Sequence, residues 1–183
     1  MNLDQLIKGC IRQNRKAQEA LYNTYKQTLF SLCLKYCSNT AEAEDNLHNA
    51  FIEIFTNIGK FNGQGSFEGW MKRITINKAI DSYKSSFHLL PIRDDHLDDT
   101  KLSESELNLP LETLLGMIQE LPNQYRLVFC LYELDDFPHQ EIAAMLSITE
   151  STSKSNLHRA KALLKEKIKT KNSFRNYDMS NGK

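Results

Sequence analysis

The 183-residue chain lacks the features that mark membrane and secreted proteins. No apolar run approaches the roughly 20 residues that a membrane-spanning helix needs. Residues 1–16 contain no uninterrupted apolar segment of the kind found in signal peptides. We therefore expect a protein that inserts into no membrane and stays in the cytoplasm.

Cysteine is scarce and shows no metal-binding spacing. The four cysteines, Cys10, Cys33, Cys37 and Cys130, include no Cys-x-x-Cys pair. Cys33 and Cys37 are one helical turn apart and could share a metal ion or a disulfide, but buried free cysteine is the commoner state. We expect all four to lie in the core, with no metal site.

Motifs for catalysis are also missing. The five histidines have no metal-ligand spacing, no glycine-rich phosphate loop is present, and no serine or cysteine lies in a nucleophile motif. Paired aspartates occur at 94–95 and 98–99, in a polar stretch where nothing would hold them in a fixed geometry. The sequence therefore predicts no enzyme, no catalytic residue, no cofactor and no small-molecule substrate.

Charge is distributed unevenly, although 23 basic and 23 acidic residues give a formal net charge of zero. Residues 150–171 hold seven Lys or Arg residues against two acidic residues, a local net charge of +5. Such a stripe suits binding to phosphates, although solvated amphipathic helices of this composition are also common.

An acidic stretch separates two helical regions. Residues 93–106 hold six acidic residues against Arg93 and Lys101, a net charge of −4. The main interpretation is an extended, solvated spacer. An acidic strand could also occupy a channel built for nucleic acid, and the sequence leaves both interpretations open.

Apolar periodicity predicts an all-α fold. Helical patterns run from Leu3 to about Ser86 and again from Leu111 to about Lys169. We therefore expect two small helical domains, residues 1–86 and 111–171, joined by a flexible acidic linker at 87–110. Residues 172–183 lack apolar periodicity and are expected to be a disordered tail.

The second long helix of the N-terminal region has a wide apolar stripe. Thr40 is its predicted N-cap. Its apolar positions recur every three or four residues, at Leu47, Ala50, Phe51, Ile54, Phe55 and Ile58. The polar outer face then holds Glu44, Asp45, His48, Asn49 and Glu53.

Aromatic and basic residues alternate in the segment that follows. Ser66 is the predicted N-cap of a helix, and Phe61 lies in the loop before it. Rings on which bases stack, together with cations that attract phosphates, suit single-stranded nucleic acid. The alternative is that Trp70 and the phenylalanines belong to the core, which is commoner for aromatics at helical spacing; Phe61 is less easily buried.

The C-terminal region has the pattern of a helix-turn-helix. Pro138 suits the first position of one helix, and Thr149 suits the N-cap of the next, with Glu150 in its first turn and Ile148 anchoring the turn in the core. Leu157, Ala160 and Leu164 share one face of the second helix. Its other faces carry Lys154, Ser155, His158, Arg159 and Lys161, which is how a helix lies in a major groove.

Three segments of the chain, residues 41–55, 61–81 and 121–164, resemble parts of bacterial RNA polymerase sigma factors of the extracytoplasmic-function type. These factors keep only the second and fourth sigma regions, and the resemblance covers roughly Ala17 to Ile168. It implies a protein that binds core RNA polymerase and directs transcription initiation. It would recognise the minus-35 and minus-10 promoter elements and stabilise melted DNA without ATP.

The resemblance also implies roles for individual residues. Those facing the polymerase would be Asp45, His48, Asn49 and Glu53. Those at the minus-10 DNA, around a pocket for a flipped base, would be Phe61, Ser66, Lys72, Arg73, Asn77 and Lys78. Those at the minus-35 DNA would be Thr152, Lys154, Ser155, Asn156, His158 and Arg159. The linker would thread through the polymerase, and an anti-sigma factor is an expected partner.

The chain departs from the family's usual residues at several positions. His48 and Asn49 stand where glutamine and glutamate are common, and Ser147 replaces a frequent turn glycine. Pro138 replaces a frequent serine cap. Asn156 stands where arginine is common, and because asparagine pairs bidentately with adenine, it would alter the minus-35 preference.

Two other functions are consistent with parts of the sequence. An autonomous helix-turn-helix regulator would bind operators as a dimer, but it would not require the aromatic and basic segment at 61–84. A helical interaction module that binds no nucleic acid would leave the basic stripe at 150–171 unexplained.

Overall fold

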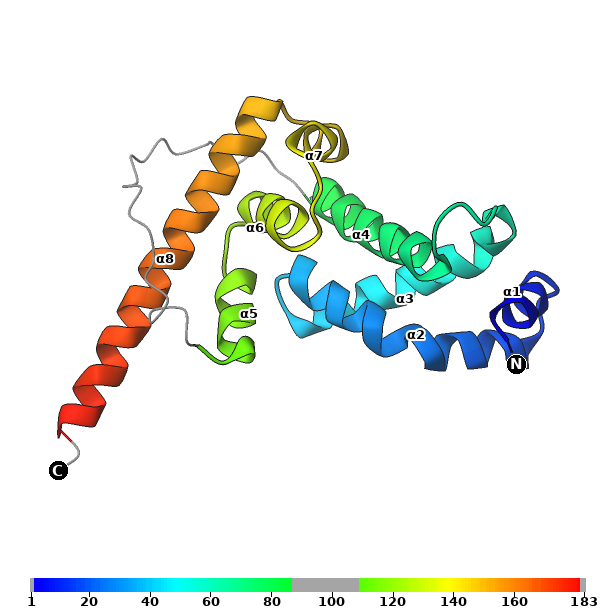
Figure 1. Ribbon diagram of the computed structural model, residues 1–183, viewed down its shortest axis with the longest axis horizontal. Coiled ribbons are helices and arrows are strands. Elements are labelled where there is room, and N and C mark those ends of the chain that lie inside the picture. Colours follow the sequence, from blue (N-terminus) through cyan, green and yellow to red (C-terminus); the bar gives the residue numbers. More distant parts are fainter. Residues whose placement is uncertain (1, 87–108, 182–183) are drawn as a thin grey trace. The chain divides into compact units, whose positions relative to one another are not determined.

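The computed structural model describes residues 2–86 and 109–181, and the side chains of residues 2–85 and 109–171. All regular structure in these ranges is helical, which confirms the predicted all-α class. The chain divides after Ser86 into two compact units, and each is described separately below. We call residues 2–86 the N-terminal unit and residues 109–181 the C-terminal unit (Figure 1). Residues 87–108, nearly all of the predicted linker, lie outside the described residues.

No helix within residues 2–86 or 109–181 combines the length and the apolar character that crossing a membrane requires.

The N-terminal unit is built around helix α2. Its helices are α1 (Leu3–Ile11), α2 (Arg15–Tyr36), α3 (Thr40–Asn57) and α4 (Phe67–Ser86), and the 3-10 turn η1 (Ile58–Lys60) follows α3. The helices α2, α3 and α4 pack against one another, and α1 packs against α2 and η1. The core is made of their apolar stripes, chiefly Leu21, Leu29, Phe51, Ile54, Ile58, Phe67 and Met71.

The start of α3 differs from the prediction by one residue. Asn39, rather than Thr40, is the N-cap, because its side chain accepts a hydrogen bond of 2.9 Å from the backbone N–H of Glu42. Asparagine ranks above threonine at this position, and Thr40 becomes the first helical residue. Ser66 caps α4 as predicted, with its hydroxyl 2.9 Å from the backbone nitrogen of Gly69.

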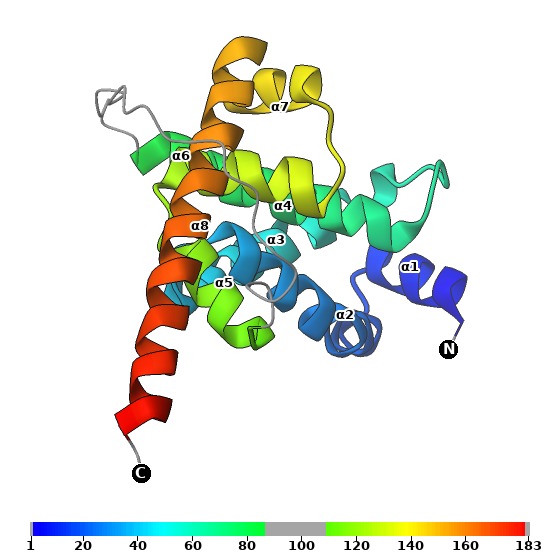
Figure 2. The same cartoon turned by 60° about the vertical axis from the view of Figure 1, so that its left-hand side comes forward.

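The C-terminal unit surrounds one long helix. Its elements are α5 (Leu111–Gln119), α6 (Asn123–Phe129), the π-helical turn η3 (Cys130–Leu134), α7 (His139–Leu146) and α8 (Glu150–Asn181). Figure 2 shows α7 beside the first turns of α8 and α5 beside later turns. The buried side chains at the centre include Leu127, Val128, Leu131, Ile142, Leu146, Leu157, Ala160 and Leu164.

The turn between α7 and α8 confirms the predicted helix-turn-helix. Ser147 ends α7 in the left-handed conformation, at φ 58° and ψ 44°. Glycine adopts this conformation without strain, so serine here costs about 1 kcal/mol. Thr149 caps α8 as predicted, with its hydroxyl 3.0 Å from the backbone nitrogen of Thr152. Helix α7 begins at His139, one residue after the predicted start at Pro138, and Ile148 is half-buried.

The backbone of α8 continues to Asn181, whereas the sequence predicts a disordered tail from residue 172. Residues 172–181 contain neither proline nor glycine. Once a helix has formed, each further residue adds a backbone hydrogen bond without a new nucleation cost. This end of α8 extends past α5 (Figure 1).

The four cysteines are buried and form no disulfide, as predicted. Burial raises the pKa of Cys33 to about 11 and also raises the pKa of Cys10. Because the thiolate is the reactive form, neither thiol is activated at neutral pH.

Candidate nucleic-acid interface and docking face

The outer face of α3 carries the residues that the sequence assigns to polymerase docking. Asp45, His48 and Asn49 are all exposed there. Ile52 lies next along the same face with 62% of its surface exposed, and sequence reasoning missed it. The sequence could have indicated this role, because Ile52 comes three residues after Asn49 on the outer face of α3 and does not belong to the buried apolar stripe of that helix. A large exposed apolar side chain among polar ones is typical of a protein contact surface.

Glu53 and Lys78, which the sequence assigns to two different surfaces, contact each other. Glu53 Oε2 and Lys78 Nζ are 3.0 Å apart, and Glu53 Oε1 accepts a hydrogen bond of 2.6 Å from Asn57 Nδ2. The Lys78 ammonium, as the main cause, holds the pKa of Glu53 below its usual value. The predicted docking and DNA surfaces therefore adjoin where α3 meets α4.

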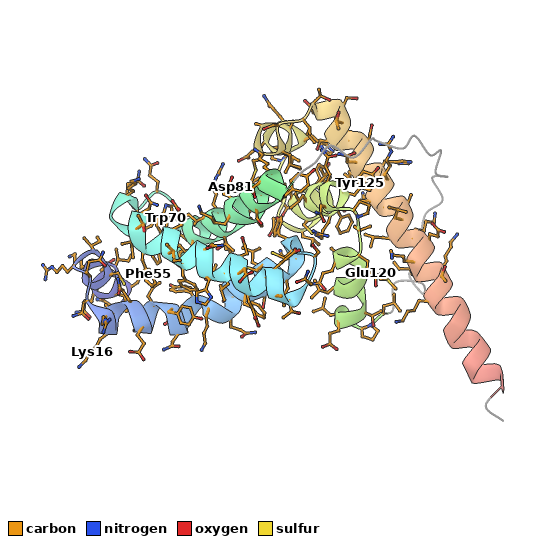
Figure 3. All side chains as sticks on the ribbon, turned by 180° about the vertical axis from the view of Figure 1, so that it is seen from behind. Lys16, Phe55, Trp70, Asp81, Glu120 and Tyr125 are labelled. Atoms are coloured by element: carbon orange, nitrogen blue, oxygen red, sulfur yellow. The ribbon has the colours of Figure 1, made fainter. Side chains whose placement is uncertain are left out.

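Three aromatic rings gather where the 61–66 loop enters α4. The ring centroid of Phe61 lies 5.1 Å from that of Phe67 and 5.7 Å from that of Trp70, which Figure 3 labels. Phe67 is buried in the core, while Phe61 and Trp70 are half-buried and keep part of each ring in solvent. The cluster therefore closes the core, and the part of the Phe61 and Trp70 rings that stays in solvent is the surface that the base-stacking interpretation requires.

The remaining predicted minus-10 residues lie along α4. Arg73 and Asn77 are exposed. Lys72 forms an ion pair of 2.6 Å with Glu68, one turn earlier. Ser66 uses its hydroxyl oxygen to cap the helix, so its contact with DNA would have to share that oxygen.

Five of the six predicted minus-35 residues lie on the outside of α8. Lys154, Ser155 and His158 are exposed, and Thr152 and Arg159 are half-buried. All fall within the first three turns of the helix. This is the part of a recognition helix that reaches base edges.

The basic stripe at 150–171 carries less free charge than its sequence indicates. Acidic partners pair with three of its lysines, in the pairs Lys154–Glu150 (2.8 Å), Lys161–Glu133 (2.7 Å) and Lys167–Glu120 (2.5 Å). Glu120 and Glu133 come from outside the stripe, so a local count of charge misses them. Lys165 is buried. Attraction to phosphates therefore rests on fewer cations than the net charge of +5 suggests.

Asn156 is not available to DNA in this structure, which corrects the prediction that it contacts the minus-35 element. Its side chain is fully buried, and neither Nδ2 nor Oδ1 has a hydrogen-bond partner. Its spacing of three from Ser153 and four from Ala160, both fully buried, puts it on the inner face of α8. The usual arginine of the family pattern could place a long side chain outside from this position, but asparagine is too short.

Replacing Asn156 by leucine should stabilise the C-terminal unit by about 1–2 kcal/mol. An unpartnered buried amide costs about this much, and leucine has the same number and branching of side-chain heavy atoms, none of them polar. We expect the transition of this unit in urea, followed by circular dichroism at 222 nm, to move to higher urea. The fluorescence of Trp70, the only tryptophan, reports the N-terminal unit and should be unchanged. A shift to lower urea would contradict the prediction.

His139 ties the two helices of the helix-turn-helix together. Its Nδ1 lies 2.8 Å from the hydroxyl of Ser153, and its ring stacks on Tyr132 with centroids 4.3 Å apart. Burial, with Lys154 as the next cause, lowers the pKa of His139. The neutral ring therefore helps to hold α7 on α8 at physiological pH.

A groove of about 570 Å³ lies between α5 and the later turns of α8. Its lining includes three acids, Glu112, Glu120 and Glu166, and two bases, Lys167 and Lys171. This balance does not favour a polyanion, and none of the lining residues is among the predicted DNA contacts.

Comparison with known protein families assigns both units. The model described as Sigma-70 region 2 matches residues 21–86, and the model described as Sigma-70, region 4 matches residues 111–164. The two matches leave only short ends and the segment between the units uncovered.

Curated relatives match nearly the whole chain. The ECF RNA polymerase sigma factor SigW of Bacillus subtilis is 29% identical, over 91% of this chain and 99% of its own length. The ECF RNA polymerase sigma-E factor of Escherichia coli is 25% identical, over 89% and 92%. Among solved structures, the sigma factor RpoE of Bartonella quintana, in complex with the anti-sigma factor NepR, has a TM-score of 0.51 at 17% identity, covering 82% of this chain and 96% of that one. This likeness supports the fold.

Proposed function

The chain belongs to the sigma-70 family, as a sigma factor of the extracytoplasmic-function type, and we propose a division of its work between the two helical units. It binds core RNA polymerase and directs promoter-specific transcription initiation. The N-terminal unit docks on the polymerase and holds the melted minus-10 element. The C-terminal unit reads the minus-35 element with α8.

Docking uses the outer face of α3. Asp45, His48 and Asn49 supply polar contacts there, and Ile52 supplies the apolar one. Glu53 borders this face and also holds Lys78 at 3.0 Å, which keeps the ammonium group beside the DNA surface of α4.

Replacing Ile52 by alanine should weaken binding to core RNA polymerase about tenfold. Covering this side chain would remove apolar surface from water, and losing most of that area costs on the order of 1–2 kcal/mol. The dissociation constant would be measured by fluorescence anisotropy of the labelled full chain with core enzyme. Gln27→Ala, at an exposed position on α2, is the control and should bind as the wild type does. Equal affinity of the Ile52 variant would remove this residue from the docking face.

The minus-10 element is held where the aromatic cluster meets α4. The exposed ring surfaces of Phe61 and Trp70 stack on unpaired bases, at about 1–3 kcal/mol per base, which offsets the cost of flipping a base. Lys72, Arg73, Asn77 and Lys78 contact the phosphates and base edges of the opened strand, and Ser66 lies at the entry to α4.

The minus-35 element is read in the major groove by Thr152, Lys154, Ser155, His158 and Arg159. The observation that carries this proposal is the helix-turn-helix itself, which leaves these side chains outside while Leu157, Ala160 and Leu164 are buried. The competing function, an autonomous regulator, gives no account of the aromatic cluster at the other unit.

Reconstituted run-off transcription tests the proposed function. Purified protein and core RNA polymerase would be supplied with a pool of promoter fragments, and transcripts should appear only when both are present. The double variant Lys154→Ala, Arg159→Ala should reduce these transcripts at least about thirtyfold, because each of the two lost contacts to a base edge costs about 1–3 kcal/mol. The matched variant Lys169→Ala, Lys171→Ala removes two exposed bases later on α8 and should retain most of the activity.

Two results would overturn parts of the proposal. Full activity of the Lys154, Arg159 double variant would exclude these residues from promoter recognition. Tight, specific binding of duplex DNA by the chain alone, with no initiation in the presence of polymerase, would favour the autonomous regulator.

Partners and compartment complete the proposal. Sigma factors are initiation factors rather than enzymes, and we propose that this chain has no catalytic centre, uses no cofactor and acts in the cytoplasm. An anti-sigma factor is its proposed regulator, and it would cover the polymerase- and DNA-binding faces of both units. The complex of the Bartonella quintana sigma factor with NepR is a precedent for this class of partner.

A further inference from the structure

The first turn of α8 presents a carboxylate beside an ammonium group. Glu150 Oε1 and Lys154 Nζ are 2.8 Å apart, and the two side chains are 52% and 61% exposed. Glu150 is the first residue of α8, and the N-cap formed by Thr149 fixes the backbone of this turn. An acceptor and a donor are therefore held side by side on a solvent-facing part of the proposed recognition helix.

The spacing of the two groups matches one base pair. On the major-groove edge of a G·C pair, guanine offers the acceptors N7 and O6, and cytosine offers the donor N4. Cytosine N4 donates to guanine O6 within the pair, so these two atoms are about 2.9 Å apart. Lys154 Nζ and Glu150 Oε1 have nearly the same separation and the opposite hydrogen-bonding character.

An A·T pair is a poorer match. Its major-groove edge runs from the acceptor adenine N7 through the donor N6 to the acceptor thymine O4, followed by a methyl group. A carboxylate at N6 would lie between two acceptors, and an ammonium group at O4 would meet the methyl. The two adjacent acceptors of guanine instead suit an ammonium group, with the cytosine donor beside them.

We propose that Glu150 and Lys154 act together to read one G·C base pair of the minus-35 element, with Lys154 donating to guanine and Glu150 accepting from cytosine N4. The inference rests on the proposed function and adds a specificity-determining residue, Glu150, to its DNA-contacting set. The pairing also makes Lys154 selective. Because Glu150 neutralises Lys154, a contact of Lys154 with a backbone phosphate alone contributes little binding free energy. The contribution is largest where Lys154 and Glu150 both form hydrogen bonds with the same base pair.

The test is a competition among promoters that carry all four base pairs at each minus-35 position. Run-off transcripts made by the wild-type chain with core RNA polymerase would be counted for each promoter. At one position the wild type should favour G·C, and Glu150→Ala should reduce that preference about tenfold, in the lower part of the roughly 5- to 160-fold range expected for a single base contact. Lys154→Ala should relax the same position. Glu150→Gln, which keeps an acceptor oxygen, should retain part of the preference.

Glu166→Ala is the matched control, because it removes an exposed acid four turns further along α8 and should leave every preference unchanged. Unchanged preferences in Glu150→Ala would overturn the inference. A rise in transcription from all promoters alike in Glu150→Ala would also overturn it, since Glu150 would then only screen charge. Absence of promoter-specific transcripts with the wild-type chain would instead be a failure of the proposed function, which separates the two ideas.

Discussion

Replacing Arg126 by alanine should destabilise the C-terminal unit by about 4 kcal/mol and abolish minus-35-dependent initiation at 37 °C. Arg126 is 3% exposed, and its guanidinium donates to the backbone oxygens of Gln119 and Leu121, both at 3.0 Å, and to Asn123 Oδ1 at 2.9 Å. Gln119 is the last residue of α5, so Arg126 donates to a carbonyl of the last turn, where the i to i+4 hydrogen bonds within the helix end. Each buried oxygen left unpaired costs about 1–3 kcal/mol, and hydrogen bonds from a charged donor are the stronger kind.

Urea unfolding of the full chain gives the measurement for Arg126. The circular dichroism transition of the C-terminal unit should shift to lower urea, while the fluorescence transition of Trp70 should keep its midpoint. Lys167→Ala is the matched control, because its ion pair with Glu120 also joins α8 to the end of α5 but is exposed. Such a pair contributes at most about 1 kcal/mol. Equal small effects of the two substitutions would show that Arg126 does not hold this turn.

The hydrogen bonds of Arg126 to the end of α5 could not be predicted from the sequence. Its role depends on where α5 ends, and the apolar periodicity that predicted the helices says nothing about the partners of the last carbonyls. The periodicity did predict the helical class and the positions of Leu157, Ala160 and Leu164 in the core of α8. These predictions succeeded because burial follows helical spacing directly.

The predictions of site residues were weaker wherever a partner lay far away in sequence. Glu133 and Glu120 neutralise Lys161 and Lys167 from other elements, so the net charge of α8 could not be read from residues 150–171 alone. Asn156 was placed among the DNA contacts by resemblance to a position where arginine is common. Asparagine at the same helical position is buried, because its side chain is too short to extend from the inner face of α8 to the solvent-exposed face.

Replacing Asn46 by alanine should destabilise the N-terminal unit by about 2–3 kcal/mol. Asn46 is 5% exposed on α3, and its Nδ2 donates to Cys33 Sγ at 3.3 Å and to the backbone oxygen of Thr75 at 3.2 Å. One amide thus connects α3 to both α2 and α4. Alanine would remove both hydrogen bonds and leave a small cavity. We expect the Trp70 fluorescence transition in urea to move to lower concentration, with polymerase binding weakened because α3 carries the docking face.

Asn46→Asp should destabilise the N-terminal unit more than Asn46→Ala does at pH 7. Its free energy of unfolding relative to the wild type should also depend on pH, whereas that of the alanine variant should not. The carboxylate would replace a donor with an acceptor facing two acceptors, the Cys33 sulfur and the Thr75 oxygen, in a site that excludes water. Both this repulsion and burial favour the protonated acid, so the pKa of the aspartate in the folded chain would lie above its unfolded value. The folded state then binds more protons than the unfolded state between these two pKa values, and stability falls as the pH rises through that range. The loss of unfolding free energy relative to the wild type should therefore be smallest below about pH 4, near the unfolded pKa of aspartate, and largest above the folded pKa.

Asn77→Asp, at an exposed position on α4, is the control, and its stability relative to the wild type should not change with pH in this way. A penalty for Asn46→Asp that stayed constant from pH 4 to pH 8 would mean that the amide is not donating to these two acceptors, and that the contact joining the three helices lies elsewhere.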